Sequence, residues 1–194
     1  MKLSIIIPAH NEEDNIASVI EKIEGVISGI DYELVVVNDH SSDRTGAIIA
    51  EASRKYDNIR LAVNNMDRGF ANALRAGFRS SSGDVVISVM ADLCDDLATI
   101  RAMWDKVGAG YDVVCGCRYI KGGKRVGGSK IKGFFSSFVG HSLHLLFGIP
   151  THDVANAFKM YRRNVIEAMK TTSRSFEISM ELALKAYYLG FKVT

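Results

Sequence analysis

The sequence predicts an α/β fold with a mainly parallel central sheet and helices on both faces. Five short apolar runs rich in β-branched residues alternate with stretches whose apolar residues recur at helical spacing. Parallel strands need long crossover connections, so this alternation is typical of a Rossmann-like sheet. The chain has 194 residues, of which 47% are hydrophobic, and can bury one full core. We therefore expect residues 1–194 to form a single domain.

The expected strands follow the apolar runs in order along the chain. Most of these runs hold Val, Ile or Leu at consecutive positions, as in strands that are buried on both faces. The expected strands are Leu3–Pro8, Glu33–Asp39, Ile59–Asn64, Asp84–Ala91 and Tyr111–Cys117.

Helices are expected between these strands, and several begin near an Asn, Ser or Asp suited to capping. The run 191–194 reads as the start of another strand, so we expect that the natural chain continues beyond Thr194 and that this chain is truncated there. The expected helices are Glu13–Ser28, Asp43–Tyr56, Gly69–Ser81, Asp96–Val107 and Phe176–Gly190.

A basic, glycine-rich loop precedes a strongly apolar segment. The stretch from Arg118 to Lys132 holds six cations and no acidic residue. The apolar segment Phe134–Ile149 is shorter than the ~20 residues of a membrane span, which leaves a core helix or an interfacial helix. Such a charge run is commonly a solvated surface, but before an apolar helix it favours peripheral contact with an anionic membrane. We favour the membrane contact.

Composition excludes several classes of protein. The net charge of +2, from 24 basic and 22 acidic residues, gives no overall indication of nucleic-acid binding. Three cysteines are too few for a disulfide framework and fit a reducing compartment. His141 and His144 have helical spacing, but without a third ligand they do not predict a metal site. We expect a cytoplasmic protein, at most peripheral at the cytoplasmic face of a membrane.

Polar residues follow three of the expected strands at their carboxyl ends, where such sheets bind ligands. Neither a G-x-G-x-x-G motif after the first strand nor a Walker loop occurs, which excludes those two ways of holding phosphates. Carboxylates at strand ends can instead bind a nucleoside and a divalent cation that neutralises a leaving diphosphate. The polar segments are 8–12, 38–43 and 90–96.

Single residues in these segments have alternative roles. Asp39 follows a buried strand and is not needed as a helix cap, so we expect it to bind a nucleoside and to contribute little to the core. The same reasoning applies to Asp92. Asn11 and Asp43 are equally suited to capping helices. Asp95 and Asp96 open a helix, where the helix dipole explains them as well as catalysis does.

Six motifs, in order along the chain, resemble those of family 2 glycosyltransferases of the dolichyl-phosphate mannosyltransferase type. The resemblance covers essentially the whole chain. It implies a GT-A fold and an inverting transfer of a sugar from a nucleotide-diphosphate sugar to a polyprenyl phosphate. The segments that carry it are Pro8–Glu13, Val37–Thr45, Arg68–Gly77, Met90–Asp92, Gly116–Tyr119 and Asp153–Arg162.

The resemblance also implies roles for individual residues. Asp92 would bind Mg²⁺ or Mn²⁺, and Arg118 would meet the acceptor phosphate with its bidentate fork, helped by Lys130 and Lys132. Met90 replaces the first carboxylate of the family's D-x-D motif, and Cys94 stands where a polar metal contact is common, so we expect a lower affinity for metal. The implied donor-site residues are Pro8, Ala9, His10, Glu12, Val37, Asp39, Arg68, Met90, Ala91 and Asp92.

Three functions stay open at this point. A polyprenyl phosphate is already ionised near neutral pH and needs no general base. Transfer to a sugar hydroxyl would need one, and Asp95 or Asp96 is the candidate. The third alternative is a nucleotide-sugar-binding protein that lost turnover together with the first D-x-D carboxylate.

Overall fold

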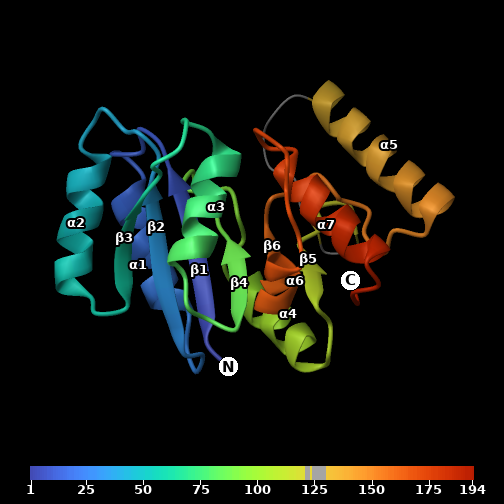
Figure 1. The fold of residues 1–194 in the computed structure, drawn as a ribbon, viewed down its shortest axis with the longest axis horizontal. Helices are drawn as coiled ribbons and strands as arrows, with labels where there is room; N and C mark the ends of the chain where they lie inside the picture. Colours follow the sequence, from blue (N-terminus) through green and yellow to red (C-terminus); the bar gives the residue numbers. More distant parts are fainter. Residues whose placement is uncertain (121–122, 124–129) are drawn as a thin grey trace.

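The computed structural model describes residues 1–120, 123 and 130–194 (Figure 1). Within these residues, six strands form one sheet in the order β3-β2-β1-β4-β6-β5. β1, β2, β3 and β4 are parallel, whereas β6 runs antiparallel to both β4 and β5. The expectation of a mainly parallel sheet is confirmed. The strands are β1 (Leu3–Ala9), β2 (Tyr32–Asn38), β3 (Ile59–Val63), β4 (Val85–Ser88), β5 (Val113–Cys115) and β6 (Lys159–Arg162).

Strand β6 is an element that the sequence analysis missed. It lies between β4 and β5, so the last expected strand is not the neighbour of β4. Its sequence, Lys-Met-Tyr-Arg, is too short and too polar to show an apolar run, yet Lys159, Met160 and Tyr161 are all buried. The C-terminal residues lie beside β5, where Val193 forms a parallel bridge with Val113, in keeping with a strand that begins there.

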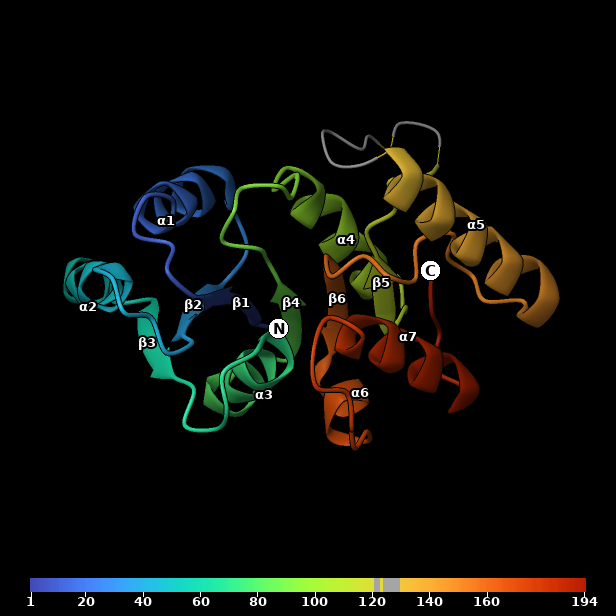
Figure 2. The same ribbon diagram turned by 90° about the horizontal axis from the view of Figure 1, so that it is seen from above.

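Helices cover both faces of the sheet, as Figure 2 shows. Strand side chains alternate between the two faces: Ile5 and Ile7 pack in one core layer, and Ile6 packs in the other. The first layer is covered by α1 (Ile16–Val26), α2 (Thr45–Lys55) and α4 (Thr99–Gly108), and the second by α3 (Phe70–Ser80), α6 (Arg163–Glu167) and α7 (Ile178–Tyr188).

Helix α5 (Lys130–Phe147) lies at the β5 side of the molecule, outside the two helical layers (Figures 1 and 2). Leu145 and Leu146 near its C-terminal end are 83% and 72% exposed, and Phe138 and Phe147 are exposed as well. The core-helix alternative is therefore wrong for this half of the segment. In the described ranges, no helix has the length and apolar character needed to cross a bilayer.

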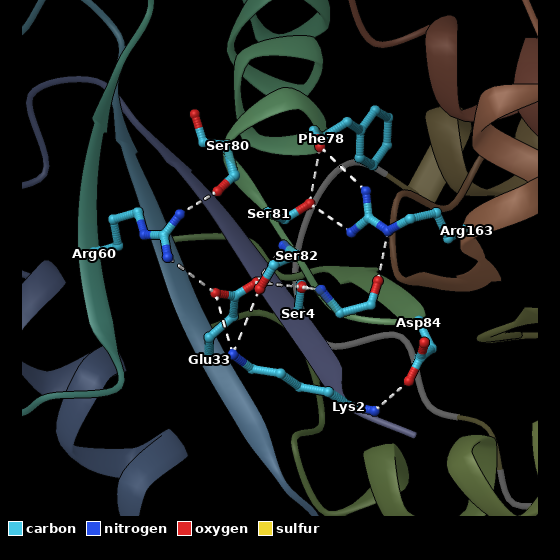
Figure 3. A network of polar contacts seen from close by, with 11 residues as sticks. Lys2, Ser4, Glu33, Arg60, Phe78, Ser80, Ser81, Ser82, Asp84 and Arg163 are labelled. Atoms are coloured by element: carbon cyan, nitrogen blue, oxygen red, sulfur yellow. Dashed lines mark hydrogen bonds and ion pairs between the residues drawn. The ribbon is translucent and has the colours of Figure 1, made fainter.

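A buried carboxylate joins the amino-terminal ends of the strands (Figure 3). Glu33 on β2 accepts hydrogen bonds from the Ser4 hydroxyl at 2.7 Å and the Ser82 hydroxyl at 3.0 Å. The Lys2 ammonium and the Arg60 guanidinium each lie 3.6 Å from its other oxygen. Burial alone would raise the pKa of Glu33, but the hydrogen bonds from Ser82 and Ser4 and the charge of Lys2 outweigh it and lower the pKa.

We expect Glu33→Gln to destabilise the fold by about 1–3 kcal/mol at pH 7, because buried donors lose a charged acceptor. A lowered pKa in the folded state means that this contribution is present above the unfolded-state value of ~4.3 and is lost as the pH falls through the folded-state value. Urea denaturation at pH 7 and pH 3 should therefore show a difference from the parent that shrinks in acid. Asp84→Asn, an exposed change at the same end of the sheet, is the control. Equal stability of parent and Glu33→Gln at pH 7 would contradict the prediction.

Candidate active site

The loops after β1, β2 and β4 meet at one edge of the sheet, as the parallel order requires. Within the described residues, the non-glycine residues with left-handed backbone are Asn11, His40 and Leu93, with φ of 53°, 56° and 61°. Each lies in one of these loops. Left-handed non-glycine residues are disfavoured and concentrate where a ligand site needs a particular backbone shape. This edge therefore carries the local strain of the fold.

Side chains join the loops after β1 and β2. The Asn11 side-chain oxygen accepts the Ser42 N–H at 2.8 Å, and the Glu12 N–H donates to the Thr45 hydroxyl at 2.8 Å. The Asp43 carboxylate accepts the Thr45 N–H at 2.9 Å, at the start of α2. Asn11 therefore links the two loops and does not cap a helix, whereas Asp43 binds the first N–H of α2.

Asp39 is buried and hydrogen-bonded within the protein, which its position at the end of a strand does not indicate. It is only 5% exposed. One carboxylate oxygen accepts the Asn64 side-chain N–H at 2.7 Å, and the other accepts the Gly69 N–H at 3.0 Å, at the start of α3. The expectation that Asp39 contributes little to the fold is wrong. Each oxygen still has a second lone pair for a ligand. Asn64, a buried residue at the end of the third apolar run, is a positioning residue that the sequence analysis missed.

His10 and Arg68 lie beside Asp39. The Nδ1 atom of His10 is 2.7 Å from the Asp39 backbone oxygen, which can only accept, so Nδ1 carries the proton. The other ring nitrogen, Nε2, then accepts from the Arg68 guanidinium at 3.4 Å. The structure therefore brings these three predicted donor-site residues together. Ala9 and Val37 are buried strand residues, and the Val37 side chain packs in the core layer under α3, so only the backbone of Val37 can meet a ligand.

The loop after β4 presents two carboxylates. Asp92 is exposed, and one of its oxygens accepts the Cys94 N–H at 3.1 Å. Asp95 accepts the N–H of Met90, another predicted donor-site residue, at 2.8 Å. Burial raises the pKa of Asp95 to about 6, the charge of Asp92 adds to this, and the Met90 N–H and Arg118 oppose it. Asp96 accepts the Ala98 N–H at 3.2 Å, one residue before α4, so its side chain stabilises the turn ahead of the helix and does not cap the helix itself.

The carboxylates fit a divalent cation that is shared with a substrate. The described part of the chain contains no group of three or more His, Cys, Asp or Glu residues that could enclose a metal ion. Mg²⁺ bound together with substrate phosphates needs only one or two protein carboxylates, and Asp92 and Asp95 are the candidates in this loop. Burial, a side-chain hydrogen bond with Asp92 and the charges of both aspartates raise the pKa of Cys94 to about 12.

Arg118 follows β5 and faces the same loop. Its Nε and Nη2 atoms lie 2.7 and 2.8 Å from the two oxygens of Asp153, whose side chain is fully buried. Hydrogen bonding to Asp153 raises the pKa of Arg118. Asp153 occupies the Nε–Nη2 side of the guanidinium, so only the Nη1–Nη2 side can meet an acceptor phosphate, and that role stays a prediction. Within the described residues, the N–H groups of Nη1 and the second N–H of Nη2 have no hydrogen-bond partner, and the side chain is 33% exposed. The side chains of Lys130 and Lys132 lie outside the described part of the structure.

Comparison with known proteins gives the family. The model for glycosyl transferase family 2 matches residues 4–169. A dolichol-phosphate mannosyltransferase of Pyrococcus furiosus is 31% identical over 194 residues, which cover 97% of this chain and 54% of that protein. An undecaprenyl-phosphate 4-deoxy-4-formamido-L-arabinose transferase of Pseudomonas fluorescens is 31% identical over 86% of this chain and 48% of its own length. The chain spans about half the length of these curated relatives.

Solved structures share the fold. A crystal structure of glucosyl-3-phosphoglycerate synthase from Mycobacterium tuberculosis, in complex with Mn²⁺, uridine diphosphate and glucosyl-3-phosphoglycerate, has a TM-score of 0.77 at 18% identity. The similarity covers 99% of this chain and 69% of that one. The central sheet and its two helical layers are those of the GT-A fold, and the chain belongs to glycosyl transferase family 2.

Proposed function

We propose that the chain transfers a sugar, with inversion, from a nucleotide-diphosphate sugar to a polyprenyl phosphate. The observation that carries this proposal is the meeting of donor-type and acceptor-type groups at one edge of the sheet. His10, Asp39 and Arg68 lie at the ends of β1, β2 and β3, and Arg118 approaches Asp95 from the antiparallel half. The names of the two polyprenyl-phosphate transferases above support the choice of acceptor.

The donor half of the site holds the nucleotide. The free lone pairs of Asp39 accept hydrogen bonds from N–H or O–H groups of a nucleoside, and Asn64 keeps the carboxylate in one orientation. Arg68, placed by His10, is positioned to bind the diphosphate. A divalent cation, Mg²⁺ or Mn²⁺, would be held by Asp92 and Asp95 and, when bound, neutralises charge on the leaving diphosphate.

The acceptor half holds the nucleophile. The guanidinium N–H groups that Asp153 leaves available orient the acceptor phosphate beside the donor sugar. An ionised phosphate oxygen forms the new bond to the anomeric carbon while the bond from that carbon to the diphosphate oxygen breaks. Because the oxygen already carries a negative charge, no proton has to be removed and no general base is needed. Attack opposite the leaving group inverts the anomeric centre.

A second candidate function is transfer to a sugar hydroxyl, which the position of Asp95 favours. The Asp95 carboxylate accepts the Met90 N–H and lies near both Asp92 and Arg118. A hydroxyl acceptor bound beside Arg118 would need a base at this place. A transfer assay separates the candidates: nucleotide-diphosphate sugars are offered with a short-chain polyprenyl phosphate or with free sugars. We expect product with the prenyl phosphate. Product with free sugars alone establishes the second candidate, and nucleotide-sugar binding without any transfer establishes a binding protein.

The proposed acceptor lies in a membrane, and we propose that α5 contacts the bilayer at its cytoplasmic face. Leu145→Gln/Leu146→Gln should weaken binding to vesicles with anionic lipid by at least about 100-fold, because burying each leucine contributes roughly 1.5–3 kcal/mol and the pair therefore at least about 3 kcal/mol. Both side chains are highly exposed, so the fold should be unaffected. Vesicle co-sedimentation at low and high salt measures the effect. The matched control is Val63→Gln, a change of an exposed residue on β3 at the far side of the sheet. Equal binding by the double variant and the control would exclude α5 as the contact.

A further inference from the structure

Asp153 binds Arg118, and the turn that carries Asp153 is in turn bound by a buried lysine, Lys159. The Asp153 carboxylate accepts hydrogen bonds from the Nε–H, an Nη2–H and the backbone N–H of Arg118, the last at 3.1 Å. Because the Asp153 side chain is fully buried, it cannot follow a moving arginine. The direction of the Arg118 guanidinium is therefore set by the turn that carries Asp153.

Lys159 on β6 binds that turn, residues 151–156, through its side chain. The Lys159 ammonium donates to the backbone oxygen of Val154 at 2.9 Å and to that of Asn156. The Asn156 side chain in turn donates to the backbone oxygen of Gly116 at 2.9 Å, two residues before Arg118. Lys159 thus supports the turn that carries Asp153 and, through Asn156, the chain segment that carries Arg118.

Lys159 is an unusual choice for this position. It is 0% exposed, and within the described part of the chain its ammonium donates to two backbone carbonyls. A buried ammonium without a directly paired carboxylate loses much solvation, and an apolar side chain of similar volume would pack there at lower cost. Its position near Asp153 gives it a second effect. Burial lowers the pKa of Lys159, and the charge of Asp153 opposes this. A carboxylate paired with Arg118 weakens the attraction of that arginine for an anion, and a charged Lys159 ammonium near the carboxylate offsets this.

We propose that Lys159 is a positioning residue that fixes Asp153, and through it Arg118, and keeps the exposed edge of Arg118 attractive to the acceptor phosphate. The inference rests on the proposed acceptor role of Arg118. It adds a group that does not touch substrate, on a strand that the sequence analysis missed.

The test uses Lys159→Met, which removes the charge and the donors, and Lys159→Arg, which keeps both. The control is Tyr161→Phe, which removes a buried polar group from the same face of β6 and leaves the 151–156 turn untouched. The first readout is the ¹H–¹⁵N signal of the Arg118 Nε–H group, assigned by its absence in Arg118→Lys. We expect this signal to shift and broaden in Lys159→Met and to stay as in the parent in Lys159→Arg and Tyr161→Phe.

The second readout is steady-state transfer to a short-chain polyprenyl phosphate. We expect the KM for this acceptor to rise about tenfold in Lys159→Met, with an unchanged KM for the nucleotide sugar and recovery in Lys159→Arg. If Lys159→Met fails to fold, Lys159→Gln serves instead, since its amide keeps two donors but no charge. An unperturbed Arg118 signal together with an unchanged acceptor KM overturns the inference. A perturbed signal in a protein whose parent does not use prenyl phosphates leaves the positioning role standing and rejects the proposed acceptor.

Discussion

Asp92→Asn is expected to lower kcat at least ~100-fold, equivalent to about 2.7 kcal/mol of transition-state stabilisation. The amide has the shape of the carboxylate but lacks the charge that binds a divalent cation. Met90 replaces the first carboxylate of the D-x-D motif, so Asp92 supplies the one negative charge that remains in the motif. Calorimetric titration of a nucleoside diphosphate with and without Mn²⁺ gives a readout that does not depend on turnover. We expect Mn²⁺ to strengthen nucleotide binding in the parent and not in the variant.

Asp96→Asn is the matched control for this prediction. It changes an exposed carboxylate in the same loop, but one that accepts the Ala98 N–H ahead of α4. The control should lose at most ~1 kcal/mol of stability, because one turn hydrogen bond weakens, and keep its dependence on Mn²⁺. If Asp92→Asn and Asp96→Asn respond to Mn²⁺ alike, Asp92 is not the cation ligand. Met90→Asp, which restores the family's first carboxylate, should strengthen the Mn²⁺ effect.

Asp39→Ala should lower the affinity for nucleoside diphosphates by about 10- to 100-fold and also destabilise the fold by about 1–3 kcal/mol. The first effect follows from the loss of a charged acceptor at the donor site. The second arises because the Asn64 amide and the Gly69 N–H both lose their acceptor inside the protein. Calorimetric titration and urea denaturation measure the two effects separately.

Ser4→Ala separates stability from binding in this experiment. It removes a buried polar contact to Glu33 at the opposite end of the sheet and should cost similar stability. If Ser4→Ala loses as much nucleotide affinity as Asp39→Ala, the effect of Asp39 on binding is indirect. Retained affinity in Asp39→Ala, with the stability loss present, would show that this carboxylate is purely structural.

The sequence alone determined the strand-helix alternation and the edge of the sheet where the polar residues gather. The consecutive apolar residues Leu34–Val37, three of them β-branched, are typical of a strand buried on both faces, and the carboxyl ends of parallel strands lie at the same end of the sheet. These patterns are local, so a reader of the chain can find them. The proximity of His10, Asp39 and Arg68 follows from the same topology.

The tertiary structure decided what local patterns do not contain. Strand β6 has no apolar run, and its pairing with β4 and β5 depends on contacts between segments more than 40 residues apart in the chain. Asp39 looks free in the sequence, but each of its carboxylate oxygens already accepts one hydrogen bond, from Asn64 and Gly69, 25 and 30 residues away. The partner of Arg118 is likewise 35 residues distant, because burying a carboxylate requires a cation that only the folded chain brings to it.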